Sequence, residues 1–352
     1  MSETKKYPSD VDLPKRKSGK RTLGFVVMVL VVAAVWGIRQ YTSMTLRYQG
    51  DEAVWLKIPH GATVSSVTDS LIATCGEEYG KAVAKLWGGN PEQSRGAYRI
   101  EPGEKAITLA RRLDSRSQTP IRLTFNNIRT LDQLDKRLTS KMDWENGEFA
   151  AEFPRVAASL GVTEAVLLGR MMPDTYEVYW TTGPQNVIVK ILDNYEAFWT
   201  PERCQKAKSL GLTPDEVGII ASIAEEETAK ADERGKVARL YINRLQKGMK
   251  LQADPTIKYA VGDFSIKRVG GKMMNIDSPY NTYRYAGLPP SPIRIPDRRT
   301  LQAVLDAPRH NYLYMCAKSD FSGYHDFTSS YAEHQRNAAI FRRALDKRGI
   351  KL

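Results

Sequence analysis

The chain has 352 residues, of which 42% are hydrophobic and 26% charged, a composition typical of a globular protein long enough for two or three domains. Its formal net charge is +12 at pH 7. The four histidines are scattered and neither CxxC nor HExxH occurs, so the sequence predicts no metal site and no cofactor. The three cysteines allow at most one disulfide and are expected to be small core residues: Cys75, Cys204 and Cys316.

A membrane anchor is predicted near the N-terminus. An uninterrupted apolar run from Leu23 to Ile38 follows a basic segment, so we expect residues 1–21 to form a cytoplasmic tail and residues 22–41 a transmembrane helix. A cleaved signal peptide is the alternative, but no small-x-small cleavage site follows promptly, which favours a retained anchor. Because basic flanks stay inside, the rest of the chain is expected on the periplasmic side of the cytoplasmic (inner) membrane.

The charge of the exported part bears on its partners. Residues 1–40 carry eight Lys or Arg and three Asp or Glu, a net charge of +5, which leaves +7 on the remainder. A mildly basic exported domain suits an anionic polymer or a membrane surface, and nucleic acid is not expected there. The alternative is that this charge serves solubility only.

Residues 42–140 repeat a loose pattern of strand, turn and helix. Strands are expected at 54–58, 97–100 and 121–125, and each is followed by a helix, the first and third of which begin after a capping threonine, Thr63 or Thr130. This pattern resembles LysM-like modules, and the resemblance implies binding of N-acetylglucosamine chains; the alternative is a generic α+β domain that acts as a spacer, and both stay open.

Residues 141–212 are predicted to be mostly helical, with amphipathic segments at 149–160, 164–168 and 187–199. Between the second and third segments lies Met172-Pro-Asp-Thr-Tyr176. Asp174 is a candidate second acid, but an aspartate before threonine more often caps a turn, and we favour that structural role.

A helix with clear boundaries starts at Thr213. Thr213 and Glu216 have the spacing of a capping box, and Pro214 occupies the first helical position, where its missing amide hydrogen costs nothing. A second helix is expected to begin at a cap on Asp232 and to end at Gly248.

Three consecutive glutamates close the first of these helices. At 100° per residue, Glu227 continues the apolar stripe of Ile220 and Ala224, Glu225 projects from the face that carries Gly218, and Glu226 lies between them. A carboxylate against isoleucine loses hydration, which raises its pKa towards the value that a general acid needs near neutral pH. Glu227 is therefore the candidate acid, and the alternative is a solvated charge run at a helix end.

The segment after the helix pair is predicted to be irregular. Residues 251–254 are expected to be extended, with Pro255 excluding further helix. The stretches 280–283 and 287–293 offer aromatic faces, amides and a rigid proline-rich backbone, which suit a preorganised wall of a sugar-binding groove, and the alternative is a packed surface loop. A hairpin over 311–327 and a helix over 329–347 complete the chain.

An ordered set of motifs resembles the endolytic murein transglycosylases of the MltG/YceG family. The motifs are Ala221-Ser-Ile-Ala-Glu-Glu-Glu-Thr228, Glu233-Arg234, Asn243-Arg-Leu245, Leu251-Gln-Ala-Asp-Pro-Thr256, Tyr280-Asn-Thr-Tyr283 and Gly287-Leu-Pro-Pro290. The resemblance implies an α+β protein with a single N-terminal transmembrane helix, a LysM-like α/β module over residues 42–140 and a mixed α+β catalytic domain over residues 141–352.

The resemblance also implies a site and a reaction. Glu227 matches the catalytic position, and the substrate-binding positions are Glu225, Gln252, Asp254, Tyr280, Asn281 and Tyr283. One residue would act first as acid and then as base, cleaving the bond between N-acetylmuramic acid and N-acetylglucosamine of peptidoglycan strands to leave a 1,6-anhydro end. The alternatives are a muramidase in which Asp254 or Asp174 activates water, and a noncatalytic peptidoglycan-binding scaffold. Cell-wall synthases are the further partners that such a function allows.

Overall fold

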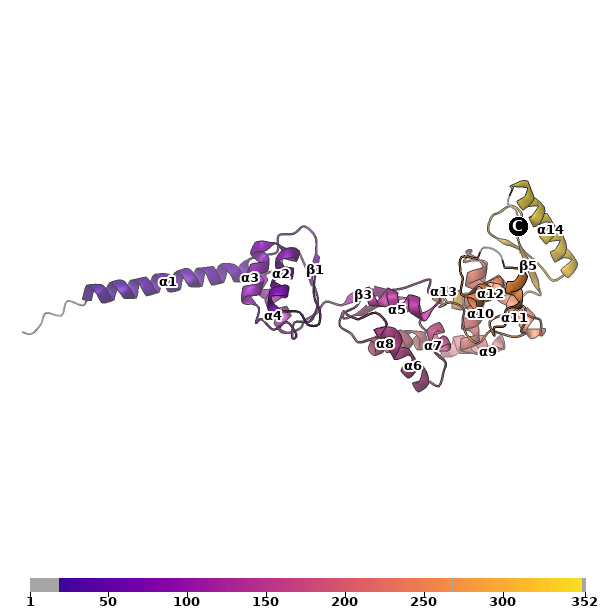
Figure 1. Cartoon of the computed structure of the whole chain (residues 1–352), viewed down its shortest axis with the longest axis horizontal. Coiled ribbons are helices and arrows are strands. Elements are labelled where there is room, and N and C mark those ends of the chain that lie inside the picture. The colour runs from indigo at the N-terminus through magenta and orange to yellow at the C-terminus, as the bar shows by residue number, and fades with distance from the viewer. Residues whose placement is uncertain (1–18, 267–268, 350–352) are drawn as a thin grey trace, which may run out of the picture. The chain divides into compact units, whose positions relative to one another are not determined.

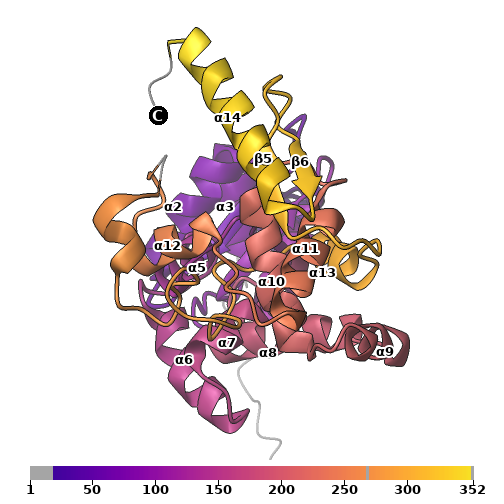
Figure 2. The same ribbon diagram turned by 90° about the vertical axis from the view of Figure 1, so that its right-hand side faces the viewer.

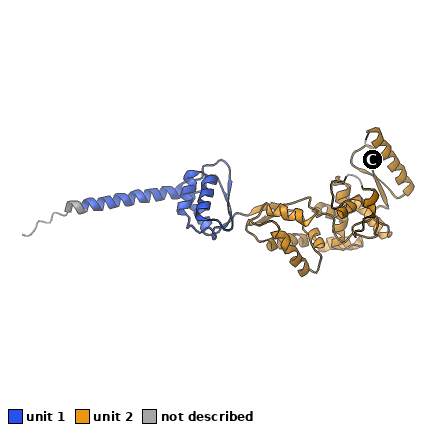
Figure 3. Ribbon diagram, in the orientation of Figure 1, with its two compact units in different colours: residues 1–119 blue, residues 120–352 orange. Residues whose placement is uncertain are grey.

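The computed structural model describes residues 19–266 and 269–349, and it divides into two compact units, residues 1–119 and 120–352 (Figure 3). The sequence placed this boundary at residue 140. The reason for the difference is that β3 (Ile121–Thr124) pairs antiparallel with β4 (Thr175–Val178), which lies in the second unit. The third copy of the strand–turn–helix pattern therefore belongs to the second unit.

The first unit begins with α1 (Gly19–Thr45), drawn as one long helix in Figure 1. Its stretch Leu23–Thr45 contains an 18-residue window with a mean hydropathy of 2.0 and no buried residue. Among the described residues, α1 is the one helix long and apolar enough to cross a membrane. Most of the predicted basic tail, residues 1–18, lies outside the described residues.

The rest of the first unit is a small α+β fold. Its elements are β1 (Val54–Ile58), α2 (Val64–Cys75), α3 (Glu77–Leu86), β2 (Gly96–Ile100) and α4 (Ala106–Asp114). β1 and β2 pair antiparallel, and the inward-facing Leu56 and Ile58 join Tyr98 and Leu113 in one core. Helix α2 starts with a capping box between Thr63 and Ser66, as the sequence pattern for a threonine cap predicts.

The second unit has two hydrophobic cores, the first built around β3 and β4. Around them lie α5 (Leu131–Thr139), α6 (Glu148–Ser159), α7 (Glu164–Gly169) and α8 (Pro184–Phe198). Leu123, Leu134, Phe149 and Ile191 are fully buried in this core. The helices of residues 141–212 follow the periodicity that predicted them.

The second core lies between α10 (Pro214–Glu227), α11 (Arg234–Gln246) and α13 (Arg298–Leu305), with α9 (Pro201–Ser209) at its edge. Figure 2 shows α10, α11 and α13 side by side. The capping box of Thr213 and Glu216 is present, as predicted. The predicted cap on Asp232 is wrong: Glu233 occupies the N-cap position without a side-chain cap.

Smaller elements complete the second unit: α12 (Asp254–Val261), the short 3₁₀ helix η1 (Gly271–Asn275), β5 (Tyr314–Ala317), β6 (His325–Thr328) and α14 (Tyr331–Lys347). β5 and β6 form the predicted hairpin, and α14 packs against β5 (Figure 2). The expectation that Pro255 excludes helix is wrong, because Pro255 lies in the first turn of α12, where its fixed φ favours a helix start.

The cysteines differ in their surroundings. Cys75 is buried as expected, whereas Cys316 is partly exposed and Cys204 is exposed. None of these three described thiols is in a disulfide. The prediction that all three are core residues therefore holds for Cys75 alone.

Candidate active site

The first glutamate at the end of α10 is held by an ion pair. Glu225 is only 6% exposed, and its carboxylate lies 3.0 Å from the Arg294 guanidinium. It also accepts a hydrogen bond of 2.9 Å from the backbone amide of Asp297. Both partners precede α13, so Glu225 fastens this segment to α10. Glu225 is held by these two contacts. It does not belong to the lining of the cleft described below.

The second glutamate is held by two arginines. Arg129, in the loop before α5, donates to both carboxylate oxygens of Glu226 at 2.9 and 3.1 Å. Arg294 donates to the same carboxylate at 2.9 Å. Two positive charges thus balance Glu226, and these ion pairs join the first core of this unit to α10.

The third glutamate has no arginine partner among the described residues. Glu227 accepts a hydrogen bond of 2.7 Å from the hydroxyl of Tyr241 on α11. Burial raises the pKa of Glu227 to about 7, the Tyr241 hydrogen bond opposes this rise, and the negative charge of Asp254 adds to it. A carboxyl with a pKa near 7 holds a proton at neutral pH and can also lose it. Its surroundings are those of a general acid.

Glu227 opens into a cleft of about 400 Å³. Lining this cleft are Glu227, Leu240, Tyr241, Arg244, Leu251, Gln252, Asp254, Tyr283, Leu313, Tyr314, Met315, Tyr331 and His334. They come from α10, α11, the start of α12, the loop before α13, the β5–β6 hairpin and α14. The cleft therefore collects side chains that are up to about a hundred residues apart in the sequence.

Three of the six predicted substrate-binding residues line this cleft. Gln252 accepts a hydrogen bond of 2.6 Å from Arg244, and its backbone has φ +54°, a conformation that non-glycine residues seldom adopt. Asp254 accepts a hydrogen bond of 2.5 Å from the Tyr283 hydroxyl. Burial and this contact raise the pKa of Tyr283 above its usual range, so the phenol stays protonated and remains a donor.

Two more predicted residues lie away from the cleft. Asn281 is fully buried, and its amide donates to the carbonyl oxygens of Met274 and Ile276 at 3.0 and 2.8 Å. Its side-chain oxygen also accepts from the backbone amide of Tyr283 at 3.0 Å. Asn281 thus shapes the loop that carries Tyr283 and does not itself face the cleft.

Tyr280 is likewise occupied by protein contacts. Its hydroxyl lies 2.6 Å from the Ser291 hydroxyl, and its ring packs on Tyr259 with the centroids 4.7 Å apart. It is absent from the lining of the cleft. Asp174 also stays outside it: it accepts from the amide of Thr175 at 2.8 Å, the turn role that we favoured.

The proline-rich segment is not a wall of this cleft. Pro292 packs over Gly169 at the end of α7, where a Cβ atom would come within 2.6 Å of its ring, and lies near Gly218 on α10; the Ile293 amide donates to Ser222 at 3.0 Å. Residues 291–293 therefore pack against the Gly218 face of α10. Residues 287–293 are absent from the lining of this cleft, and residues 291–293 are packed against protein, because the sequence could show that the segment is rigid but not which surface it covers.

Several lining residues were not anticipated from the sequence. The apolar periodicity of α11 marked Tyr241 as core, which is correct for its ring but hides the role of its hydroxyl. Arg244 lies beside that stripe and reaches both Gln252 and the carbonyl of Leu313, at 2.6 and 2.9 Å. The hairpin and α14 bring three more residues into the lining: Tyr314, Tyr331 and His334. In the sequence, only the recurrence of aromatic residues around position 314 pointed to them.

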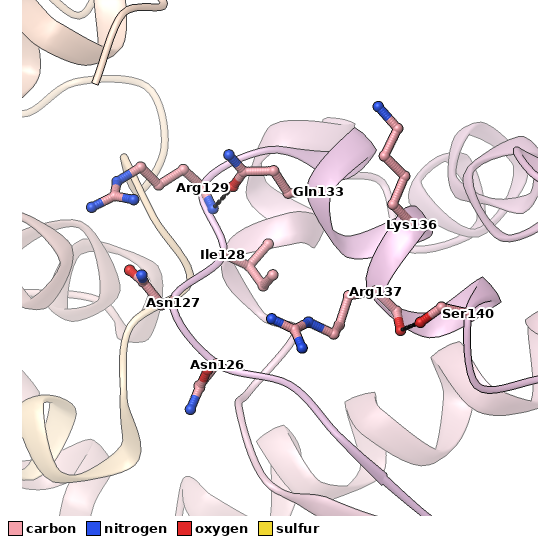
Figure 4. Close-up of a pocket in the computed structure, with 8 residues that line it drawn as sticks. All are labelled: Asn126, Asn127, Ile128, Arg129, Gln133, Lys136, Arg137 and Ser140. Atoms are coloured by element: carbon pink, nitrogen blue, oxygen red, sulfur yellow. Dashed lines mark hydrogen bonds between the residues drawn. The ribbon is translucent and has the colours of Figure 1, made fainter. Parts of the chain in front are cut away.

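A separate hollow lies along α5 and the loop before it (Figure 4). It is lined by Asn126, Asn127, Ile128, Arg129, Gln133, Lys136, Arg137 and Ser140. None of these lining residues is a carboxylic acid, so this hollow offers no proton donor for cleavage of a glycosidic bond. Glu227, with its raised pKa and its place in the other cleft, stays the candidate acid.

Comparison with known protein families gives a match over most of the chain. The profile of the YceG-like family matches residues 56–340, which include α10, the cleft and the first ten residues of α14. The chain belongs to the YceG-like family. This confirms the resemblance that the motifs from Ala221 to Pro290 indicated.

Two proteins with similar sequences carry the name endolytic murein transglycosylase. One, from Bacillus subtilis (strain 168), is 32% identical over 206 residues, which are 57% of this chain and 56% of the relative. The other, from Streptococcus pneumoniae serotype 2, is 30% identical over 197 residues, which are 54% of this chain and 35% of the relative. The matches therefore span about half and about a third of the two relatives.

A solved structure supports the fold. A YceG-like protein from Listeria monocytogenes has a TM-score of 0.56 and 23% identity to this chain. The comparison covers 82% of this chain and 99% of the Listeria protein. At 23% identity, the similarity shows that the two proteins share a fold.

Proposed function

We propose that this protein is a membrane-anchored endolytic lytic transglycosylase that cleaves peptidoglycan strands between N-acetylmuramic acid and N-acetylglucosamine. The observation that carries the proposal is the carboxyl of Glu227, which has a pKa of about 7, no arginine partner among the described residues and a place in the cleft. The names of the Bacillus and Streptococcus relatives support the same activity.

Protonated Glu227 gives its proton to the glycosidic oxygen, and the bond to the anomeric carbon of the muramic acid breaks. Positive charge develops on that carbon, and the acetamido group of the same sugar stabilises it. Glu227 is now a carboxylate and receives a hydrogen bond from Tyr241. It removes the proton from the C6 hydroxyl, which attacks the anomeric carbon and leaves a 1,6-anhydro end.

Tyr241 helps Glu227 to act first as an acid and then as a base. Its hydrogen bond stabilises the charged form of Glu227, whereas burial stabilises the neutral form. The opposition of the two effects keeps both forms accessible near neutral pH. The pKa of Tyr241 itself is raised by burial and by Glu227, so its hydroxyl remains a donor throughout.

Hydrolysis at the same bond is the second candidate, and Asp254 is the observation that favours it. Asp254 lines the same cleft as Glu227 and could activate water as a second carboxylate. Its carboxylate already accepts a hydrogen bond from Tyr283, and its charge helps to raise the pKa of Glu227. We assign Asp254 this electrostatic role together with contact to the substrate, and we assign Gln252 and Tyr283 to substrate binding.

The remaining parts of the chain fit a protein of the cell envelope. We propose that α1 is a retained anchor in the cytoplasmic membrane, with the rest of the chain on the periplasmic side. The antiparallel β1–β2 pair with α2 and α3 supports a LysM-like module in the first unit, which would hold or space the enzyme on glycan. Cleavage of nascent strands there would end their elongation, next to the cell-wall synthases that make them.

Mass spectrometry of products from purified glycan strands tests the reaction. The full-length protein in detergent should release fragments with 1,6-anhydro ends, whose mass lacks the water that hydrolysis adds. Fragments with reducing ends would support the muramidase instead. Binding of strands without any cleavage would support a noncatalytic scaffold.

A further inference from the structure

Three aromatic rings form one wall of the Glu227 cleft, and we call them the aromatic face: Tyr314, Tyr331 and His334. The ring of Tyr314, on β5, lies 5.5 Å from that of Tyr331 and 5.4 Å from that of His334. Tyr314 and His334 stack with 23° between their planes. Tyr331 and His334 are three residues apart on α14 and so share one side of that helix.

The aromatic face is held in place from both sides. The guanidinium of Arg244 lies 5.7 Å from the centre of the Tyr314 ring and donates to the carbonyl of Leu313. The same guanidinium donates to Gln252 across the cleft. Behind the face, Ser330 caps α14 by accepting from the amide of Glu333. The rings are thus positioned before any ligand arrives, which lowers the entropy lost on binding.

The exposure of Tyr331 is not explained by packing of the protein. Tyr331 is 58% exposed at the first residue of α14, although it is a large apolar ring beside a cleft. Burial lowers the pKa of His334, and the positive charge of Arg244 lowers it further, so the ring is neutral at pH 7. The wall that faces the cleft is therefore aromatic and uncharged, apart from Arg244 at its base.

Other lining residues of the cleft are polar or acidic. They include Glu227, Asp254 and the amide of Gln252. A pyranose ring matches this pair of surfaces, because it has a flat face of C–H groups and an edge of hydroxyl groups. An anion such as a phosphate would meet the carboxylate of Asp254 there and is a poor match.

From this arrangement we propose that the aromatic face is a saccharide-binding subsite, which holds one sugar ring of the strand by stacking beside the bond that Glu227 protonates. The proposal rests on the proposed function and adds a ligand subsite to it. Tyr331 supplies the exposed stacking surface, and Tyr314 and His334 support it. The polar side chains of the lining bind the hydroxyl and acetamido groups of the same strand.

Replacement of Tyr331 tests the subsite in the full-length protein. Tyr331→Ala should raise KM for purified glycan strands by roughly three- to tenfold, the effect of one lost aromatic contact, while kcat changes less. Tyr331→Phe keeps the ring and should recover most of the affinity. Tyr179→Ala is the matched control, because Tyr179 is 51% exposed and lies outside the cleft lining.

Direct titration separates this proposal from the reaction itself. In the Glu227→Gln background, adding Tyr331→Ala should weaken binding of the strands by the same factor, measured by calorimetry. Equal affinity with and without Tyr331→Ala, or a Tyr331→Phe variant as weak as the alanine variant, would overturn the subsite. A wild-type protein that gives no anhydro product overturns the proposed reaction instead, and the titration then still decides whether the aromatic face binds saccharide.

Discussion

The hydroxyl of Tyr241 donates a hydrogen bond of 2.7 Å to Glu227, and it joins α11 to the end of α10 at the bottom of the cleft. This contact distinguishes Glu227 from its two neighbours, which are paired with arginines. A neutral donor stabilises the carboxylate less than an arginine does, so Glu227 keeps a raised pKa.

Tyr241→Phe should move the pH profile of activity. Loss of the hydrogen bond removes an interaction that favours the charged carboxylate, so the pKa of Glu227 should rise further, by about one unit for a hydrogen bond to a charged group. Glu227 would then stay protonated to higher pH, and the alkaline limb of the kcat/KM profile should shift upward. An unchanged limb would show that another group sets it.

Glu227→Gln should abolish most of the activity. Glutamine keeps the shape of the side chain but cannot transfer the proton, so release of anhydro product should fall by roughly 10² to 10⁴, or more because one residue serves both steps.

The stability of Glu227→Gln relative to wild type should also depend on pH. The wild-type carboxyl binds its proton more tightly when folded, with a pKa of about 7 against 4.5, so wild-type stability falls as pH rises through this window.

The gain in melting temperature of Glu227→Gln over wild type should therefore be larger at pH 8 than at pH 5, as thermal unfolding in both buffers would reveal. The counterpart variant is Glu225→Gln. If Glu225→Gln loses the anhydro product per folded molecule while Glu227→Gln retains it, the acid is Glu225.

Glu226→Gln should cost stability and spare the chemistry. The substitution leaves Arg129 and Arg294 without their shared carboxylate, of which only 18% is exposed, and the free energy of unfolding should fall by about 2 kcal/mol. Urea unfolding measures this loss. Glu202→Gln is the control: its pair with Lys206 is exposed, and its loss should cost less than about 0.5 kcal/mol. A hundredfold loss of anhydro product without a change in stability would instead make Glu226 catalytic.

Asn281→Ala should destabilise the protein, contrary to what its place in the motif predicted. The fully buried amide makes hydrogen bonds to Met274, Ile276 and Tyr283, and its removal leaves their backbone groups unpaired, at a cost of about 2–3 kcal/mol. Activity should fall as well, because the loop that carries Tyr283 loses its anchor. Asn126→Ala, at an exposed asparagine, is the control for urea unfolding. A normal midpoint with reduced turnover would return Asn281 to the substrate groove.

Removal of residues 1–41 should give a soluble fragment that still cuts glycan strands. Backbone hydrogen bonds that join the segment after α1 to the rest of the first unit lie beyond the cut: the Leu46 carbonyl accepts from Ala106 and the Tyr48 amide donates to the carbonyl of Glu104, both at 2.9 Å. Cell fractionation without detergent, followed by the product assay, checks this result. A fragment that stays with the membrane would contradict anchoring by α1 alone.

The sequence by itself determined the features that depend on local spacing. The apolar run of α1, the capping box of Thr213 and the helical phase that separates the three glutamates all depend on residues within a few turns of one another. The choice of Glu227 as candidate acid came from this phase, and the raised pKa in the structure agrees with it. These features could be predicted from the sequence because the residues that cause them are close together in the chain.

The tertiary structure alone decided which residues share the cleft. Sequence order put Tyr280, Asn281 and the proline-rich segment after the acid helix and could not show that they pack against other protein surfaces. Tyr241, Tyr314 and His334 reach the cleft from elements that are brought together only by packing of α11, the hairpin and α14. The partners of Glu225 and Glu226 are also distant in sequence, so their ion pairs follow from chain folding and not from spacing.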